Sequence, residues 1–399
     1  MSKQVQDAYI VAATRTPIGK SGRGFFRNTR PDDLLVAAVR NALSQVPSLD
    51  PKAIEDAIIG CSFPEGEQGI NMARVAMVMA GLPHSVGGVT INRFCASGIT
   101  AVQMAADRIR VGQADVMIAG GAESMSMVPM GGNKPSFNPE VFTRDENVGI
   151  AYGMGLTAER VAEQWKVSRE AQDAFALQSH QRALKAMAAG EFKDEMTPVT
   201  VVDRFPNLTT GEVVTKTRVV ELDEGARPDT SLEGLAKLKP VFSAKGSVTA
   251  GNSSQTSDGA GALILASEKA IKQFDLKPLA RFVSFAVRGV PPAIMGIGPI
   301  EAIPAALRYA GLTLDDIGWI ELNEAFAAQS IAVMESCKLD PSKVNPMGGA
   351  VALGHPLGAT GAIRSATVIH ALHRHNLKYG MVTMCVGMGQ GAAGIFERV

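Results

Sequence analysis

The segment Cys95-Ala-Ser-Gly98-Ile-Thr100 is matched near the other end of the chain by His355-Pro-Leu-Gly358-Ala-Thr360. In both, glycine and threonine stand three and five residues after the first residue, and a helix pattern follows that leads into a strand. The sequence upstream repeats too: an alanine-rich helix pattern, a leucine-aspartate pair and an apolar strand recur in residues 34–61 and 300–323. Such internal similarity indicates two related units, and alternating strand and helix patterns predict an α/β fold.

Working outward, the first half shows further elements. Helix starts are signalled by Pro31 followed by Asp32 and Asp33, since acidic side chains favour the first turn. The apolar spacing predicts strands at residues 8–13, 57–61 and 114–119, and helices at residues 32–43 and 97–111.

A segment of different texture lies between the halves. It begins with a methionine-, glycine- and proline-rich loop, continues with a helical stretch that has a start signal at Ser168, and ends in a polar, β-prone run. We predict an N-terminal half of residues 1–123 plus 251–275, an inserted loop domain of residues 124–250, and a C-terminal half of residues 276–399.

Composition excludes several classes of protein. The 399 residues include 39 basic and 39 acidic side chains and only 5% aromatics, which lacks the basic, stacking surface of a nucleic-acid-binding protein. The four cysteines (Cys61, Cys95, Cys337 and Cys385) are too scattered for a disulfide framework or a zinc ribbon. The sequence shows no targeting segment at Met1 and no membrane-length apolar run, so we expect a cytoplasmic protein.

Cys95 and His355 occupy equivalent helix starts. A thiol at a helix N-terminus faces unpaired N–H groups, which favour the thiolate. If the halves pack by pseudo-twofold symmetry, the two starts approach each other and the imidazole can activate the thiol. Taken singly, Cys95 also fits a buried cysteine at a turn, and His355 a turn residue beside Pro356.

Two further loop ends carry polar groups. Cys385 precedes a turn with Gly387, Gly389 and Gly391, where main-chain N–H groups can approach a reacting oxygen. A dinucleotide site is excluded there because only eight residues follow Gly391. Asn323 ends an apolar strand and could hold a water, or could cap a helix.

The other candidates are assigned no chemistry. His370, His373 and His375 resemble a metal cluster, but no carboxylate is near in sequence and we expect a solvated helix end. Cys61 and Cys337 are interpreted as packing residues.

Along nearly its whole length the chain resembles the thiolase family. The stretches that carry the resemblance are residues 15–19, 92–98, 119–125, 250–259, 323–326, 348–361 and 385–391. The resemblance implies a five-layered αβαβα fold with two repeated halves and an inserted loop domain that binds coenzyme A. It implies no metal and no cofactor, with acyl-CoA and coenzyme A as substrates.

The resemblance also implies roles for the residues singled out above. Cys95 would carry the acyl group, His355 would activate it, and Cys385 would be the acid–base. The N–H groups of Cys95 and Gly387 would form one oxyanion hole, and His355 with a water on Asn323 the other. Positions similar to coenzyme A or acyl-pocket contacts in relatives are Arg227, Phe242, Ser254, Met154 and Phe326.

The branch of the family is predicted from positions at which this chain differs from the relatives that condense acetyl-CoA. Relatives that condense acetyl-CoA usually have histidine before the pocket methionine, where this chain has Gly153, and commonly glycine in place of Met388. Residues 291–299 look more like the degradative branch. We therefore expect a 3-ketoacyl-CoA thiolase of fatty-acid β-oxidation or a similar route, with acetyl-CoA acetyltransferase as the alternative.

Two alternative functions belong to other classes of protein. A non-catalytic acyl-CoA- or lipid-binding relative would not need Cys95, His355, Cys385 and Asn323 together, and a ketoacyl synthase would pair its cysteine with two histidines or with histidine and asparagine. The resemblance further implies a homodimer or homotetramer, and a hydratase–dehydrogenase partner occurs with some degradative relatives.

Overall fold

The computed structural model describes residues 5–399; residues 1–4 of the predicted N-terminal half, including Met1, lie outside this range. Its main sheet has the strand order β10-β11-β12-β9-β1-β8-β5-β3-β4. Outward from the β1–β9 junction, the order β9-β12-β11-β10 on one side matches β1-β8-β5-β3 on the other, and β4 lies beyond β3. The short strand β2 (Gly19–Lys20) pairs with β8 beside this path. The first half supplies β1 (Tyr9–Arg15), β3 (Asp56–Gly60), β4 (Val89–Ile91), β5 (Val116–Ser124) and β8 (Ser257–Ala266). The second supplies β9 (Ala280–Gly289), β10 (Ile317–Leu322), β11 (Tyr379–Val386) and β12 (Gln390–Arg398).

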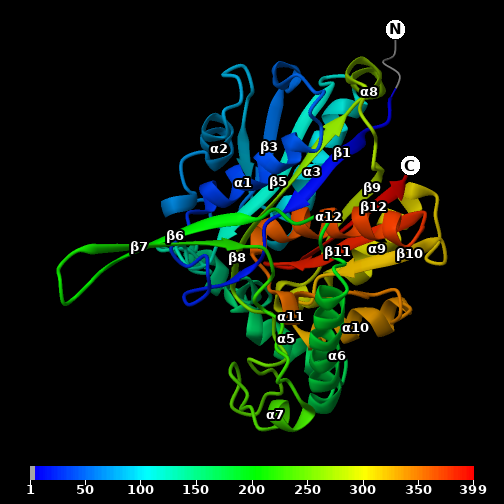
Figure 1. Cartoon of the computed structure of the whole chain (residues 1–399). Helices are drawn as coiled ribbons and strands as arrows, with labels where there is room; N and C mark the ends of the chain where they lie inside the picture. Colours follow the sequence, from blue (N-terminus) through cyan, green and yellow to red (C-terminus); the bar gives the residue numbers. More distant parts are fainter. Residues whose placement is uncertain (1–4) are drawn as a thin grey trace.

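The strands of each half form one β layer, and helices between and outside these two layers complete five layers. This confirms the predicted αβαβα fold with two repeated halves. One outer layer contains α1 (Pro31–Ser44) and α2 (Met72–Ala80), and the other contains α9 (Gly298–Ala310) and α10 (Ala327–Cys337). The central layer pairs α3 (Ser97–Arg110) with α12 (Leu357–Arg374), which contacts strands of both halves. Figure 1 shows the blue and cyan first half beside the yellow to red second half.

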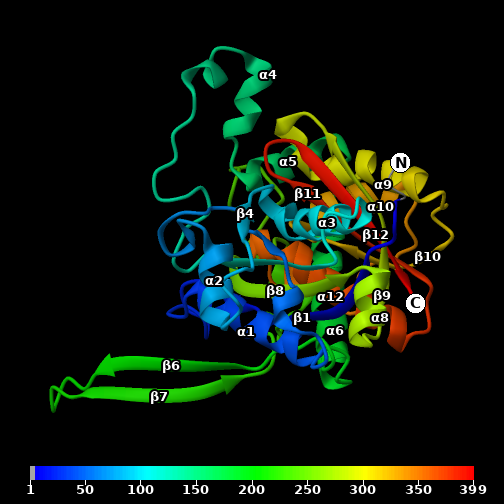
Figure 2. The ribbon, with the colours of Figure 1, turned by 90° about the horizontal axis from the view of Figure 1, so that it is seen from above.

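The segment between the halves forms helices and a projecting hairpin. The predicted helical stretch is interrupted: α5 (Met154–Gln164) ends before Lys166, and α6 (Arg169–Ala188) begins after the Ser168 cap, whose hydroxyl accepts from the Ala171 N–H. The β-prone run becomes the hairpin of β6 (Val199–Pro206) and β7 (Val213–Val220), which extends from the body (Figure 2). The remaining helices are α4 (Asp145–Val148), α7 (Leu232–Ala236), α8 (Glu268–Phe274) and α11 (Ala350–Leu353). The three domain boundaries stay a prediction.

The pairing of α3 with α12 depends on glycine. A Cβ on Gly361 would lie 2.2 Å from the Ile99 nitrogen, and one on Gly98 would lie 2.5 Å from the Ala362 nitrogen. The two helices therefore approach backbone to backbone, which holds their first turns close together. No helix in residues 5–399 is long and apolar enough to cross a membrane.

Gly361→Val should lower the free energy of unfolding by about 3 kcal/mol or more, because overpacking at a backbone contact forces the central helices apart. Chemical denaturation measures the change. Gly289→Ala is the control, since its nearest neighbour would lie 3.9 Å from the new Cβ. An unchanged stability in the valine variant would show that the helix pair can shift without cost.

Candidate active site

The Cys95 thiol sits at the start of the central helix α3. A short 3-10 helix, η3 (Phe94–Ala96), leads into α3 and is entered through Phe94 at φ 43°, in the left-handed region. The side chain is buried, and the N–H groups of Gly387 and of Cys95 itself hydrogen bond to the sulfur. Burial nevertheless dominates and raises the pKa of Cys95 to about 12. The resting residue is therefore a thiol at neutral pH and needs a base.

His355 immediately precedes α12 and is fixed by three elements. Its Nε2 lies 3.2 Å from Asn323 Nδ2, its Nδ1 lies 2.6 Å from Thr360 Oγ1, and its main-chain N–H donates to Ser257 Oγ at 3.1 Å. Because an amide nitrogen only donates, Nε2 accepts and Nδ1 carries the proton toward Thr360. Burial, followed by the positive charge of Arg364, lowers the pKa of His355 to about 3. The imidazole is therefore neutral, with the acceptor nitrogen on the Asn323 side.

Cys385 lies at the end of β11, where the predicted glycine turn begins. It is fully buried and packs in an apolar cluster with Phe326, Met295 and Met154. Burial and the neighbouring Cys95 sulfur raise the pKa of Cys385 far above its usual range. The structure thus brings the two cysteines together, with the Gly387 N–H beside the first.

Asn323 is held rigidly at the end of β10. Its main-chain N–H donates to the Thr383 carbonyl at 2.9 Å, and its own carbonyl accepts from Gln329 Nε2 at 3.2 Å. The side-chain Oδ1 is buried and has no hydrogen-bond partner among the described residues. Since buried polar atoms are normally paired, this oxygen fits a water position.

Sequence reasoning assigned no role to Glu123, which the structure places at the junction of the halves. Its carboxylate accepts from the N–H groups of Ser62 and Gly358, both at 2.8 Å, and from Gln68 Nε2 at 2.8 Å. It thereby ties the end of β5 to the start of α12. Cys61 Sγ donates to the same carboxylate at 3.7 Å, so its interpretation as a pure packing residue is wrong. The only sequence signal was the glycine-rich stretch at residues 119–125.

The predicted binding residues divide into two groups. Met154 and Phe326 pack with Cys385, and Phe242 meets Phe326 in an edge-to-face contact with ring centroids 6.1 Å apart. The Ser254 N–H donates to the Ala325 carbonyl beside this cluster. Arg227 lies elsewhere, in the wall of a separate pocket.

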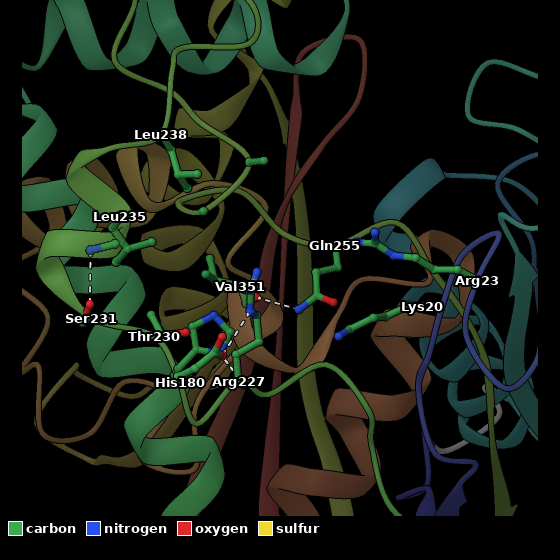
Figure 3. Close-up of a pocket in the computed structure, with 14 residues that line it drawn as sticks. Lys20, Arg23, His180, Arg227, Thr230, Ser231, Leu235, Leu238, Gln255 and Val351 are labelled. Carbon is green, nitrogen blue, oxygen red and sulfur yellow. Dashed lines mark hydrogen bonds and ion pairs between the residues drawn. The ribbon is translucent and has the colours of Figure 1, made fainter.

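That pocket is a cavity of about 300 Å³ with a charged side and an apolar side. Figure 3 shows Lys20 and Arg23 across from Leu235 and Leu238, with Arg227 and His180 between them. The Arg227 N–H donates to His180 Nδ1 at 3.1 Å. Burial lowers the pKa of His180 to about 4, and the nearby positive charges of Arg227 and Lys20 act in the same direction.

The three C-terminal histidines each contact a different part of the structure. His370 Nε2 lies 2.8 Å from the Ala13 carbonyl, His373 Nε2 lies 2.6 Å from the Leu279 carbonyl, and His375 stacks on Trp319. The expected solvated helix end is therefore wrong in part, because each ring binds a different element. In residues 5–399, no group of three or more histidine, cysteine, aspartate or glutamate side chains could hold a metal ion.

The chain matches two family descriptions end to end: "Thiolase, N-terminal domain" over residues 8–269 and "Thiolase, C-terminal domain" over residues 276–398. A 3-ketoacyl-CoA thiolase of Bacillus subtilis (strain 168) is 49% identical over 98% of this chain and 100% of its own length. The peroxisomal 3-ketoacyl-CoA thiolase A of Rattus norvegicus is 46% identical over 98% of this chain and 88% of its own.

Two solved structures share the whole fold. The acetyl-CoA acetyltransferase of Bacillus anthracis superposes with a TM-score of 0.89 at 39% identity, covering 100% of both chains. The human mitochondrial 3-ketoacyl-CoA thiolase in complex with CoA superposes with a TM-score of 0.87 at 40% identity, covering 99% of both.

Proposed function

This chain belongs to the thiolase family of acyltransferases, and we propose that it cleaves 3-ketoacyl-CoA with coenzyme A to give acetyl-CoA and a shortened acyl-CoA. The observations that carry the proposal are the two neighbouring buried cysteines, Cys95 and Cys385, and the His355–Asn323 pair at the start of α12, the helix that contacts the short segment containing Cys95. One cysteine can be acylated while the other still handles protons. A single Cys–His pair would leave no proton donor for the carbon leaving group.

The first half-reaction breaks the C2–C3 bond. His355 Nε2 takes the Cys95 proton as the sulfur attacks C3, and the N–H groups of Cys95 and Gly387 bind the C3 oxygen. The C2–C3 electron pair moves into the acetyl-CoA enolate, whose oxygen is bound by protonated His355 and a water on Asn323. Cys385 then gives its proton to C2. The products are acetyl-CoA, an acyl-Cys95 thioester and a Cys385 thiolate.

The second half-reaction restores the enzyme. The Cys385 thiolate removes the proton of the incoming coenzyme A thiol, and the resulting thiolate attacks the acyl-Cys95 carbonyl in the same oxyanion hole. The Cys95–acyl bond breaks, and His355 returns its proton to the Cys95 sulfur. The protons therefore balance over one turnover, and no metal or redox step is needed.

The test is coenzyme A-dependent loss of 3-ketoacyl-CoA compared across acyl chains. Activity that persists from acetoacetyl-CoA to longer chains supports the degradative assignment. Activity confined to acetoacetyl-CoA would favour an acetyl-CoA acetyltransferase, a candidate supported by the full-length match to the Bacillus anthracis enzyme. The absence of turnover with every chain would contradict both.

Coenzyme A is proposed to bind in the pocket of Lys20, Arg23 and Arg227. A pantetheine arm must reach Cys95 and Cys385 while its phosphates stay at a cationic, partly open surface. Lys20 and Arg23 are not paired with a carboxylate among the described residues, whereas Arg227 lies 3.6 Å from Asp229. The two unpaired cations are thus available to phosphate oxygens.

The double variant Lys20→Ala/Arg23→Ala should raise the KM for coenzyme A about tenfold with kcat nearly unchanged, because each solvent-accessible cation contributes about 1 kcal/mol or less. Steady-state kinetics at low ionic strength measures the effect, which salt should weaken. Lys272→Ala is the matched control, since its ammonium lies 3.8 Å from Glu268 on an exposed helix. An unaltered KM would place the phosphates elsewhere.

A homodimer is proposed as well, with β4 as its contact. This strand pairs with β3 on one side and is the last strand of the main sheet, and Val89 is exposed on it. A free strand edge is a ready template for pairing with a second copy. The tetramer, the hydratase–dehydrogenase partner, the cytoplasmic location and the role in β-oxidation stay predictions from the sequence.

A further inference from the structure

The first turn of α12 is capped by a residue of the other half of the molecule. The helix begins at Leu357, and Pro356 at the N-cap position makes no side-chain hydrogen bond to it. The first N–H groups of a helix have no partner within the helix and need one outside it. Glu123, near the end of β5, supplies that partner, because its Oε2 accepts from the Gly358 N–H at 2.8 Å. A negative charge at this end is also stabilised by the helix dipole.

The Glu123 carboxylate is buried and surrounded by hydrogen-bond donors. Its Oε2 also accepts from the Ser62 N–H at 2.8 Å, and its Oε1 accepts from Gln68 Nε2 at 2.8 Å and from Cys61 Sγ at 3.7 Å. A protonated carboxyl group would need an acceptor, whereas these groups and the Gly358 N–H all donate. Burial raises the pKa of Glu123 and the hydrogen bonds lower it, so the donor set favours the ionised form.

Glycine contacts fix α12 against this carboxylate. A Cβ on Gly358 would lie 2.7 Å from Glu123 Oε2 and 2.7 Å from the Cys61 Cα. A Cβ on Gly121 would lie 2.3 Å from the Gly358 carbonyl oxygen. The first turn of α12 therefore packs directly on β5 and on the residues after β3. His355 precedes Gly358 by three residues, so its place depends on where the Glu123 carboxylate holds this turn.

Glu123 also acts on the sulfur of Cys95 through its charge. Two main-chain N–H groups at this sulfur favour the thiolate, whereas burial and the negative charge of Glu123 disfavour it. The neighbouring Cys385 is an uncharged thiol at neutral pH, because burial raises its pKa far above the usual range. Arg93, two residues before Cys95, donates to Gln390 Oε1 at 3.3 Å. Glu123 thus supplies a fixed negative charge that opposes the hydrogen bonds to the sulfur.

A protonated resting thiol suits the proposed reaction. The thiolate is the form that reacts with alkylating agents and oxidants, so a low thiolate fraction protects Cys95 between turnovers. Its ionisation then depends on a correctly placed base, which is the role proposed for His355. The two effects of Glu123 therefore act together, because the same carboxylate disfavours the free thiolate and fixes the helix start that follows the base.

We propose that Glu123 is a positioning residue for thiolysis: its carboxylate fixes the first turn of α12, and with it His355, and its negative charge keeps the Cys95 sulfur protonated in the resting enzyme. The effect on His355 rests on the proposed function. The effect on the Cys95 sulfur does not, since it concerns the enzyme without substrate.

Glu123→Gln and Glu123→Asp separate the charge from the position. Glutamine removes the charge at nearly the same shape, whereas aspartate keeps the charge and is one methylene too short to reach the Gly358 N–H. We expect both variants to lose about tenfold or more in kcat for thiolysis of acetoacetyl-CoA, because His355 is displaced. Alkylation of Cys95 by iodoacetamide at pH 8 should become about threefold or more faster in the glutamine variant only.

Alkylation is followed by peptide mass spectrometry of the intact, substrate-free protein. The half-buried Cys337 is the internal standard, and labelling of the buried Cys61 shows how far the site has opened. Glu55→Gln is the matched control: its carboxylate accepts from the N–H groups of Asp115 and Val116 at the other end of β5. This control should leave both kcat and the labelling of Cys95 unchanged.

The outcomes that would overturn the proposal are distinct. Labelling of Cys95 at the wild-type rate in Glu123→Gln, or equally faster labelling in both variants, would refute the charge effect. An unchanged kcat in both variants would refute the positioning of His355. Wild-type protein that shows the expected labelling but no thiolysis with any 3-ketoacyl-CoA would instead refute the proposed function, because labelling does not depend on turnover.

Discussion

Cys95→Ala should reduce thiolysis by about four orders of magnitude or more and should leave the protein without any acyl-enzyme. The reason is that both half-reactions of the proposed mechanism pass through one thioester on Cys95, the side chain whose sulfur the Gly387 N–H binds. Mass spectrometry of the intact protein after incubation with acetyl-CoA measures the adduct directly. Steady-state thiolysis measures the loss of turnover.

Cys337→Ala is the control for this experiment. Cys337 is half-buried at the end of α10 and is not among the residues that contact Cys95 or Cys385 in the described structure. It should acylate and turn over like the wild type. A stable acyl adduct on the Cys95→Ala protein would assign the nucleophile to another residue.

The fold could be predicted because its decisive feature is repeated in the sequence. The matching helix starts at Cys95 and His355 predict equivalent helices. The strand order of the two halves, which matches outward from the β1–β9 junction, shows the same repeat in the structure. The break at Lys166 could not be predicted, because its φ of 55° is taken by lysine where glycine would have been a signal. Glycine at position 361, by contrast, marks a backbone contact only once its neighbour Ile99 is known.

Candidate site residues could be predicted from the sequence where the side chain itself is reactive. They could not be predicted where the role depends on a contact between residues far apart in the chain. A thiol, an imidazole and an amide at loop ends are visible in the sequence. Glu123 is not, because its function depends on the Gly358 N–H, which lies 235 residues away along the chain. A cavity bordered by Phe94 and Met388 is similarly hidden, since its walls come from four separate segments of the chain.

Cys385→Ala should separate the proton transfers proposed for Cys385 from the acylation proposed for Cys95. The variant should still accept an acetyl group from acetyl-CoA onto Cys95, slowly, because that exchange expels a thiolate and needs no proton at carbon. Carbon–carbon cleavage should fall by about a hundredfold to ten-thousandfold, since general acid catalysis at C2 is lost. The acyl adduct is measured by intact-protein mass spectrometry and the cleavage by loss of 3-ketoacyl-CoA.

The variant is not expected to lose its fold, because Cys→Ala at the end of β11 removes one buried atom from the cluster of Phe326, Met295 and Met154. Cys385→Ser is the isosteric comparison: it restores volume but offers a weaker acid, so it should cleave almost as slowly as the alanine variant. Cleavage at the normal rate in either variant would remove the acid–base role from Cys385. Loss of the acyl adduct together with cleavage would instead mean that Cys385 acts in forming the thioester, and the division of labour between the two cysteines would have to be reversed.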